Sequence, residues 1–338
     1  MTELKKDSHL ISQHIKALKE GLILPESQKF WPDFLYHFTD IKNAIKILSG
    51  DRCLYSRNHL ASDGQIQTDS ACAEIIEKTD PEYKNYVRLY FRPRTPTLFC
   101  VEGIRTPEEL TYGAHCPVPV YFIFNAFPIL SQESTKFSNG NLSVGDVKVS
   151  DSVDFYLNLP FDKIYHDRRL PDDNEEEKKS IIFHRHAEVM IPQSMDLDHL
   201  RFIYFRSKAE FQTLSYWLKL NGSHELWHSK IGIDEKSNLF FSRWLFVQDV
   251  SMNASQIVIK LNPPENPNMI TMKCNITNPE LNLDCRWDVN LGPATNYNAP
   301  FAFNLQAIGN PLKYEFTIWL DGNLAFQNYY NEAHNDPF

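Results

Sequence analysis

The chain has 338 residues, of which 42% are hydrophobic and 23% charged, values usual for a globular protein with room for two domains. Its formal charge of -9 argues against a protein that coats nucleic acid by bulk electrostatic attraction. The charge does not exclude a local basic groove that binds nucleic acid. The longest apolar run, residues 118–130, is interrupted by Pro119, Asn125 and Pro128 and is too short to span a bilayer. The six cysteines form no C-x-x-C pair and no signal peptide precedes them, so we expect free thiols and a cytoplasmic protein without membrane contact.

The N-terminal part opens with a predicted amphipathic helix at residues 4–23, which should pack on its own domain. Residues 34–38 predict a strand, and Thr39 or Asp40 then caps a helix that Gly50 ends. A strand that ends in polar groups at a helix N-terminus suits a phosphate or amide ligand, which makes His37 a candidate. A lone histidine on a strand is, however, more often a structural residue.

A second informative string, YVRLYFRPRTPTLF, occupies residues 86–99 after a largely polar stretch with a helical portion near residues 71–77. Apolar residues alternate with Arg88, Tyr90 and Arg92, which predicts a strand with one cationic and aromatic face. Two prolines then fix the loop that carries Arg94. Such residues bind phosphates and stack on rings, or equally form a solvated edge strand.

The third string, FHRHAEVMI at residues 183–191, predicts a short strand that places Glu188 among apolar neighbours. A buried glutamate is costly unless a cation or a ligand pairs with it, and Arg185 is the expected partner if Glu188 is structural. The polar connection before it, residues 162–182, is either a surface excursion or an element that binds substrate. His184 and His186 lack a third ligand at a useful spacing, so we expect no metal.

The remaining elements divide the chain into three parts. Strands are predicted at residues 117–127, 155–159 and 202–205, and an amphipathic helix at residues 209–220. Beyond residue 222, six short alternating runs separated by Asn, Pro and Gly predict a small antiparallel β-sandwich that serves as an interaction module. We therefore expect an N-terminal helix at residues 1–30, a catalytic domain at 31–222 and the β-rich module at 223–338.

Taken together, the strings YHFTDIKNAIKIL (36–48), YVRLYFRPRTPTLF (86–99) and RHAEVMI (185–191) resemble, in order and spacing, those of the DarT family. These are NAD-dependent ADP-ribosyltransferases that modify bases in single-stranded DNA. The resemblance covers residues 31–220 in fragments. It implies an α+β fold whose ADP-ribosyltransferase-like catalytic domain has a split central sheet, with NAD as co-substrate and no metal. It also implies a bacterial toxin or phage-defence effector that acts on single-stranded DNA or RNA and is restrained by an antitoxin or held by a chaperone, through the C-terminal module.

The resemblance also implies a role for individual residues. The catalytic residues would be Glu188 and Arg94. The residues implied for NAD binding are His37, Thr39, Asn43, Tyr90 and Arg92. Those implied for the nucleic-acid substrate are Arg88, Arg168, Arg169 and Arg185.

Two departures from the family bear on the acceptor base. Members that modify thymine carry an arginine before the second string, but residues 61–86 contain none, and Arg88 stands where those members tend to have proline. Guanine, adenine and RNA therefore stay open as acceptors. Two other functions also stay open: ADP-ribosylation of a protein, and a non-catalytic binding module of the same fold.

Overall fold

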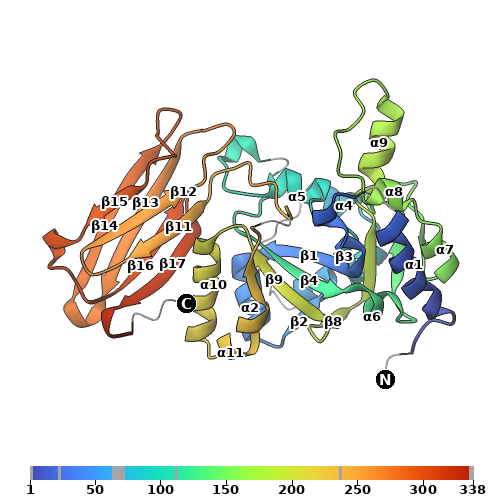
Figure 1. Ribbon diagram of the computed structural model, residues 1–338, viewed down its shortest axis with the longest axis horizontal. Coiled ribbons are helices and arrows are strands. Elements are labelled where there is room, and N and C mark those ends of the chain that lie inside the picture. The colour runs from blue at the N-terminus through green and yellow to red at the C-terminus, as the bar shows by residue number, and fades with distance from the viewer. Residues whose placement is uncertain (1–2, 22–23, 63–72, 111–112, 236–237, 335–338) are drawn as a thin grey trace.

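A computed structural model describes residues 3–21, 24–62, 73–110, 113–235 and 238–334 of the chain. It shows an α+β domain built on an eight-stranded sheet and, beside it, a β-sandwich formed by the C-terminal part (Figure 1). The predicted fold class is thus confirmed. Helix α10 (Lys208–Leu220) lies between the two parts and contacts both.

The large sheet contains strands from both ends of the first domain. Every neighbouring pair is antiparallel except β10 and β9, which are parallel. In spatial order the strands are β10 (Ile231–Ile233), β9 (Leu200–Phe205), β4 (Pro119–Asn125), β1 (Phe34–Asp40), β3 (Tyr86–Tyr90), β7 (Glu188–Pro192), β5 (Lys136–Ser138) and β6 (Val149–Ser150).

The sheet divides in its middle, between β1 and β3. These strands share a single register pair, Tyr36 with Tyr90, whereas β1 pairs with β4 along all of its residues. We call this place the seam. The sheet thus has little strand pairing at the seam, which agrees with the predicted split central sheet.

Helices surround the large sheet, and a small two-stranded sheet of β2 (Cys53–Tyr55) and β8 (Ser194–Asp196) lies against its strands β3 and β7. Helix α1 (Ser8–Gly21) buries Ile11, Ile15 and Leu18 in the core of this domain, as its amphipathic pattern predicts. The other helices are α2 (Ile41–Ser49), α3 (Arg57–Ser62), α4 (Ala73–Lys78), α5 (Pro96–Val101), α6 (Ala126–Leu130), α7 (Val153–Leu157), α8 (Phe161–Ile164), α9 (Glu175–His184) and α11 (His224–Trp227).

The C-terminal part, which we call the β-module, consists of two antiparallel sheets. One contains β11 (Val247–Met252), β12 (Gln256–Leu261) and β15 (Phe301–Asn304) in that spatial order. The other has the order β14 (Leu283–Leu291), β13 (Ile270–Asn278), β16 (Lys313–Leu320) and β17 (Asn323–Asn331). Alternate residues of these strands point inward and form a second core.

Three predicted segments differ in the structure. Residues 155–159 were expected as a strand, but α7 occupies this place because the Ser152 side chain accepts from the Phe155 N–H and caps a helix. The expected polar connection at residues 162–182 contains α8 and α9, and the Asn174 side chain caps α9. Helix α9 also takes up residues 183 and 184, so the predicted strand begins only at Glu188.

Several contacts bear on the proposed domain boundary at residues 222 and 223. Strand β10 pairs with β9 in the large sheet, and Trp227, Leu239 and Phe240 belong to the first core. These contacts favour a boundary after Phe240, which we propose in place of the earlier one. Among the described residues, no helix is long and apolar enough to cross a membrane.

Candidate active site

Glu188 is fixed by three neighbouring strands on one side of the seam, β3, β7 and β5. It is the first residue of β7 and lies directly opposite Tyr90 of β3 in the register. Its N–H donates a 2.9 Å hydrogen bond to the Ser138 hydroxyl at the end of β5. The residue is only 4% exposed, so the strand pairing holds a carboxylate inside the domain, next to the seam.

The carboxylate of Glu188 is poorly paired for a buried charge. Its Oε2 lies 3.7 Å from a guanidinium nitrogen of Arg88 and, within the described part of the chain, has no hydrogen-bond partner. Burial raises the pKa of Glu188 to about 7, and the charge of Arg88 opposes that rise. Arg185 was expected to pair with Glu188 if that glutamate were structural, but its Nε instead donates to the main-chain oxygen of His166, at 2.7 Å.

At the seam, His37 lies close to Arg88. Its Nδ1 lies 3.2 Å from the main-chain oxygen of Arg88, where the ladder between β1 and β3 is interrupted. Because a carbonyl oxygen only accepts, Nδ1 carries the proton, and burial lowers the pKa of His37. The imidazole is therefore neutral with Nε2 as an acceptor. Arg88 thus connects His37, through its main chain, to Glu188, through its side chain.

Aromatic and polar groups line the same place. The Tyr90 ring stacks on Phe38 with 6.0 Å between centroids, and burial, followed by the charge of Glu188, raises the pKa of Tyr90. Beyond the seam, Asn43 on α2 donates to the Thr39 hydroxyl at 3.2 Å. The Asp40 side chain caps α2, as predicted, by accepting from the Lys42 N–H.

Arg94 lies in the loop after β3 in an unusual conformation. Its φ of 51° is uncommon for a residue other than glycine and must be held by its surroundings. Its N–H donates to the Tyr121 hydroxyl at 3.2 Å, and its guanidinium lies 3.4 Å from the Asp167 carboxylate. The guanidinium also covers the Phe241 ring, 4.8 Å from its centroid.

Arg92, for which the sequence predicts a role in NAD binding, is enclosed by other parts of the protein. It is 1% exposed and its guanidinium pairs with Asp167 at 2.5 Å. Further donors go to the main-chain oxygens of Pro93, Ile164 and His166. The guanidinium also covers the Trp31 ring, so Arg92 is a core residue that holds the loop carrying Asp167.

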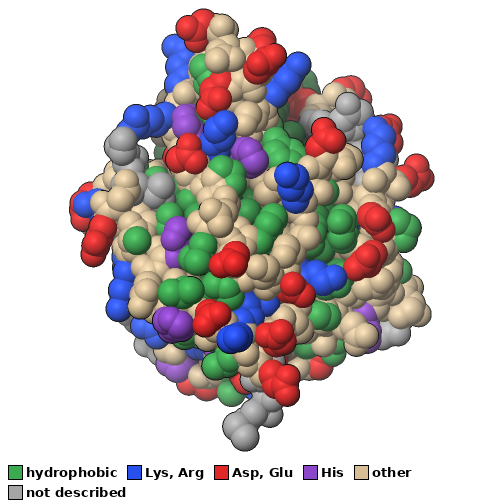
Figure 2. All heavy atoms as spheres, turned by 90° about the vertical axis from the view of Figure 1, so that its right-hand side faces the viewer, with side chains coloured by type: hydrophobic (Ala, Val, Ile, Leu, Met, Phe, Trp, Pro, Cys, Tyr) green, Lys and Arg blue, Asp and Glu red, His purple; other side chains and the backbone are tan. Residues whose placement is uncertain are grey.

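The arginines predicted for the substrate are distributed around that loop. The Arg185 guanidinium donates to the main-chain oxygens of His166, at 2.7 Å, and Arg168, at 3.1 Å. Arg168 and Arg169 are exposed, and Arg169 forms an ion pair with Asp172. On the face shown in Figure 2, basic and acidic side chains are interspersed, so cationic character comes from individual side chains and not from a continuous patch.

Sequence reasoning missed several residues that shape this site. Asp167 pairs with both Arg92 and Arg94 and accepts from the Gln28 amide at 2.7 Å. Nothing in the local sequence around Asp167 indicates partners so far away in the chain. His184 and His186, considered above for a metal, bind the main-chain oxygens of Asn139 and Ile182.

A family model matches the greater part of the chain. The sequence model described as "ssDNA thymidine ADP-ribosyltransferase, DarT" matches residues 36–235, more than half of the chain. Among solved structures, Thermus sp. 2.9 DarT in complex with ADP-ribosylated ssDNA is 16% identical over 62% of this chain and 97% of that chain, with a TM-score of 0.48. The same protein in complex with NAD+ is 15% identical over 64% and 99%, with a TM-score of 0.46. Thermosipho africanus DarTG in complex with ADP-ribose is 15% identical over 62% and 51%, with a TM-score of 0.44. No curated protein matches the chain.

Proposed function

This chain belongs to the DarT family of single-stranded-DNA ADP-ribosyltransferases, with NAD as co-substrate, and on that premise we propose that Glu188 is its catalytic carboxylate. The observation that carries the proposal is the placing of a buried, poorly paired glutamate directly opposite Tyr90, beside the seam of a split sheet. Burying a charge without full compensation is costly, and such sites are typical of function.

The chemistry requires a carboxylate with these properties. The bond between nicotinamide and C1′ of the ribose breaks with its electron pair going to nicotinamide, and an oxocarbenium-like cation develops on the ribose. The Glu188 carboxylate stabilises that positive charge. A nitrogen of the acceptor base then bonds to C1′ and gives its proton to Glu188. A pKa of about 7 suits a group that must be ionised and still accept a proton near neutral pH.

The residues at the seam and in the Arg94 loop suit the two halves of NAD. The neutral His37 presents Nε2 as an acceptor for a ribose hydroxyl or a carboxamide N–H, with Thr39 and Asn43 beside it. The Tyr90 ring offers a stacking surface for nicotinamide. We assign Arg94 to the pyrophosphate, because its side chain is partly exposed, at 29%, and shares the Asp167 carboxylate with Arg92.

The acceptor is a base in a single strand, since a base must be unstacked to reach C1′. The exposed Arg168 and Arg169 precede α9 and suit contacts with strand phosphates. Thymine is the base in the family description. Arg88, beside Glu188, is the residue that would contact a different acceptor base. We further propose that the enzyme acts in the cytoplasm, where both substrates occur, as a toxin or phage-defence effector.

An antitoxin or chaperone would bind the β-module. This part of the proposal is supported by large apolar side chains that the β-module exposes, among them Met269, Leu281, Leu312 and Tyr329. Co-purification of the wild-type chain and of a Leu281→Asp, Leu312→Asp variant from the same cells would test it. Loss of a stoichiometric partner in the variant is expected, and retention would contradict this use of the surface.

The function is tested by incubating the enzyme with labelled NAD and one of five acceptors: three DNA oligonucleotides rich in thymine, guanine or adenine, an RNA, and lysate protein. Mass spectrometry of the digested products identifies the modified base. Label on a DNA base, absent with Glu188→Gln, is expected. Label on protein alone would favour a protein-directed transferase. If NAD is neither bound nor consumed, the chain is a binding module with the same fold.

A further inference from the structure

The chain passes along the catalytic domain once more before it enters the β-module. We call residues 240–244 the attachment segment. The Phe240 ring packs against Tyr121 with 5.0 Å between centroids, and the Phe241 ring meets Phe99 of α5 at 5.1 Å. The Arg243 guanidinium in turn covers the Phe99 ring, 4.6 Å from its centroid. The attachment segment is therefore packed against the loop and short helix that follow Arg94.

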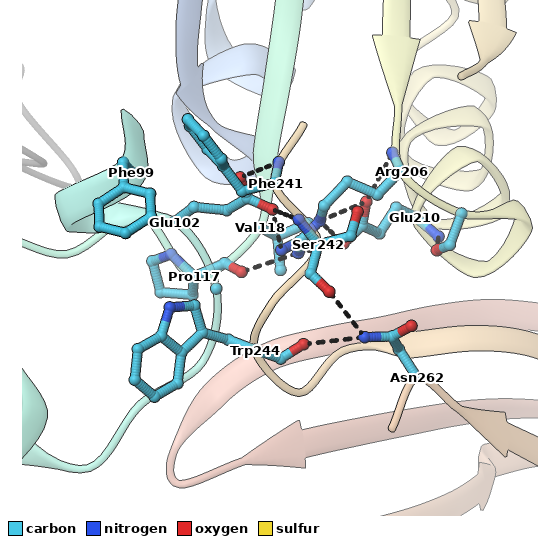
Figure 3. Close-up of polar contacts among 12 residues, drawn as sticks. Phe99, Glu102, Pro117, Val118, Arg206, Glu210, Phe241, Ser242, Trp244 and Asn262 are labelled. Atoms are coloured by element: carbon cyan, nitrogen blue, oxygen red, sulfur yellow. Dashed lines mark hydrogen bonds and ion pairs between the residues drawn. The ribbon is translucent and has the colours of Figure 1, made fainter. Parts of the chain in front are cut away.

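A buried carboxylate fixes the main chain of this segment, as Figure 3 shows. Glu102, directly after α5, accepts the N–H of Phe241 and the N–H of Ser242, both at 2.8 Å. Its Oε1 also lies 3.4 Å from the Arg206 guanidinium, which pairs with Glu210 of α10. Because the Glu102, Arg206 and Glu210 side chains are almost fully buried, the segment cannot leave Glu102 without taking two hydrogen bonds from a buried carboxylate.

The β-module holds the same segment from the other side. Asn262, the first residue after β12, donates through Nδ2 to the main-chain oxygens of Ser242, at 3.1 Å, and Trp244, at 3.2 Å (Figure 3). The Trp244 ring lies under the Arg105 guanidinium of the catalytic domain, 4.3 Å away. The attachment segment is thus held between the two parts of the molecule.

The Phe241 ring connects this arrangement to the site, because it supports the Arg94 guanidinium at 4.8 Å. Helix α5 begins two residues after Arg94 and ends one residue before Glu102. The loop that carries Arg94 and the carboxylate that fixes the segment are consequently the two ends of one short, rigid element. A shift of the segment would move both.

We propose that the attachment segment is part of the NAD site, with Phe241 as the positioning residue for Arg94, so that the seating of the β-module sets the affinity for NAD. The proposal rests on the function proposed above for Arg94. A cation over an aromatic ring contributes about 0.5–2 kcal/mol, which corresponds to roughly two- to thirty-fold in an equilibrium constant.

The test replaces the ring and keeps apolar bulk. With Phe241→Leu, the KM for NAD and the dissociation constant of NAD by calorimetry should both rise roughly two- to thirty-fold, while kcat changes less. Phe241→Tyr keeps the ring and should restore wild-type values. The control is Phe303→Leu, which removes an aromatic contact with Trp287 inside the β-module, at 4.8 Å, and should leave the KM unchanged.

The outcomes separate this inference from the function on which it rests. If the folded Phe241→Leu variant binds NAD as the wild type does while the wild type transfers ADP-ribose, the inference alone is wrong. If the wild type neither binds nor consumes NAD, the proposed function fails and the inference with it. Should Phe241→Leu not fold, Phe241→Met carries the same test, and equal KM values for Phe241→Met and wild type would overturn the inference.

Discussion

Two buried glutamates in this molecule have opposite surroundings. Glu102 is 1% exposed and its two oxygens accept two main-chain N–H groups and face the Arg206 guanidinium. Glu188 is 4% exposed and has one cation, Arg88, at 3.7 Å, with no hydrogen-bond partner for Oε2 within the described chain. The Glu102 carboxylate has hydrogen-bond donors and a cation from the protein itself, whereas Glu188 Oε2 has no hydrogen-bond donor within the described chain.

The difference shows how a buried charge can be classified. At Arg206 burial lowers the pKa, but the carboxylates of Glu210 and Glu102 outweigh this and raise it, so the arginine keeps its charge. At Glu188 burial outweighs the single arginine and raises the pKa to about 7. A satisfied buried charge holds structure together, and an incompletely satisfied one keeps capacity for a substrate.

The largest effect is expected from Glu188→Gln on transfer. The amide cannot stabilise a cation by its charge or take a proton, so kcat should fall at least about a hundredfold. Single-turnover transfer from labelled NAD measures it. Glu280→Gln, an exposed substitution in the β-module, is the matched control and should retain wild-type activity. A Glu188→Gln variant with more than a tenth of wild-type kcat would remove Glu188 from the mechanism.

Arg206→Met should be the most destabilising change, because it leaves two buried carboxylates without their cation. We expect a loss of about 3–5 kcal/mol in the free energy of unfolding, measured by urea denaturation. Arg286→Met removes an exposed ion pair with Asp284 and should cost less than about 1 kcal/mol. Equal effects of the two substitutions would show that the cluster does not hold the structure as described.

In contrast to Arg206→Met, Glu188→Gln should increase the free energy of unfolding at alkaline pH. The pKa of Glu188 is about 7 in the folded protein, against an ordinary value of 4.5, so the folded state loses stability as pH rises between these values. The glutamine variant avoids this loss and should be more stable by at most about 3 kcal/mol at pH 8, with little gain at pH 5. Denaturation at both pH values measures it, and a destabilised variant at pH 8 would contradict the raised pKa.

The smallest expected effect is a shift of the pH profile with Arg88→Gln. The arginine lowers the pKa of Glu188, so its removal should move the acidic limb of kcat/KM upward by about one pH unit. Activity at pH 7 would fall and partly return at pH 8. Arg88→Lys keeps the charge and should keep more of the original profile. An unshifted limb would show that the Glu188–Arg88 pair does not control this ionisation.

The parts of the fold that the sequence predicts are those encoded locally. Strand β1, the cap at Asp40 and helix α2 follow from alternation and a capping residue within a few positions, and the structure confirms them. Helix α9 was missed because its Glu- and Lys-rich sequence has little amphipathic pattern and its start depends on the Asn174 cap. Strand β17 was missed, although Asp321 and Gly322 form the turn before it.

The candidate site depends on contacts that local sequence does not encode. That Arg88, and not Arg185, faces Glu188 follows from the register of β3 on β7, which come from distant parts of the chain. Arg92 and Arg94 belong to one short string and both pair with Asp167, yet one lies in the core and the other in the candidate site, because the Trp31 ring and the main-chain oxygens of Ile164 and His166 contact only the first. The alternation of apolar and polar residues shows which side chains share a face of a strand, but it does not show which other parts of the chain cover that face.

Helix α10 belongs to both cores at once. Its Leu214 and Leu218 are packed under the large sheet, while Ala209 lies in the core of the β-module. On the β-module side, its Thr213 hydroxyl accepts the Gln327 N–H at 3.1 Å, and Tyr216 donates to Glu315. A chain shortened to residue 235, where the family match ends, would expose this side of α10 to water. Such a fragment would be prone to aggregate, so inactivity of an isolated transferase portion would say nothing about its chemistry.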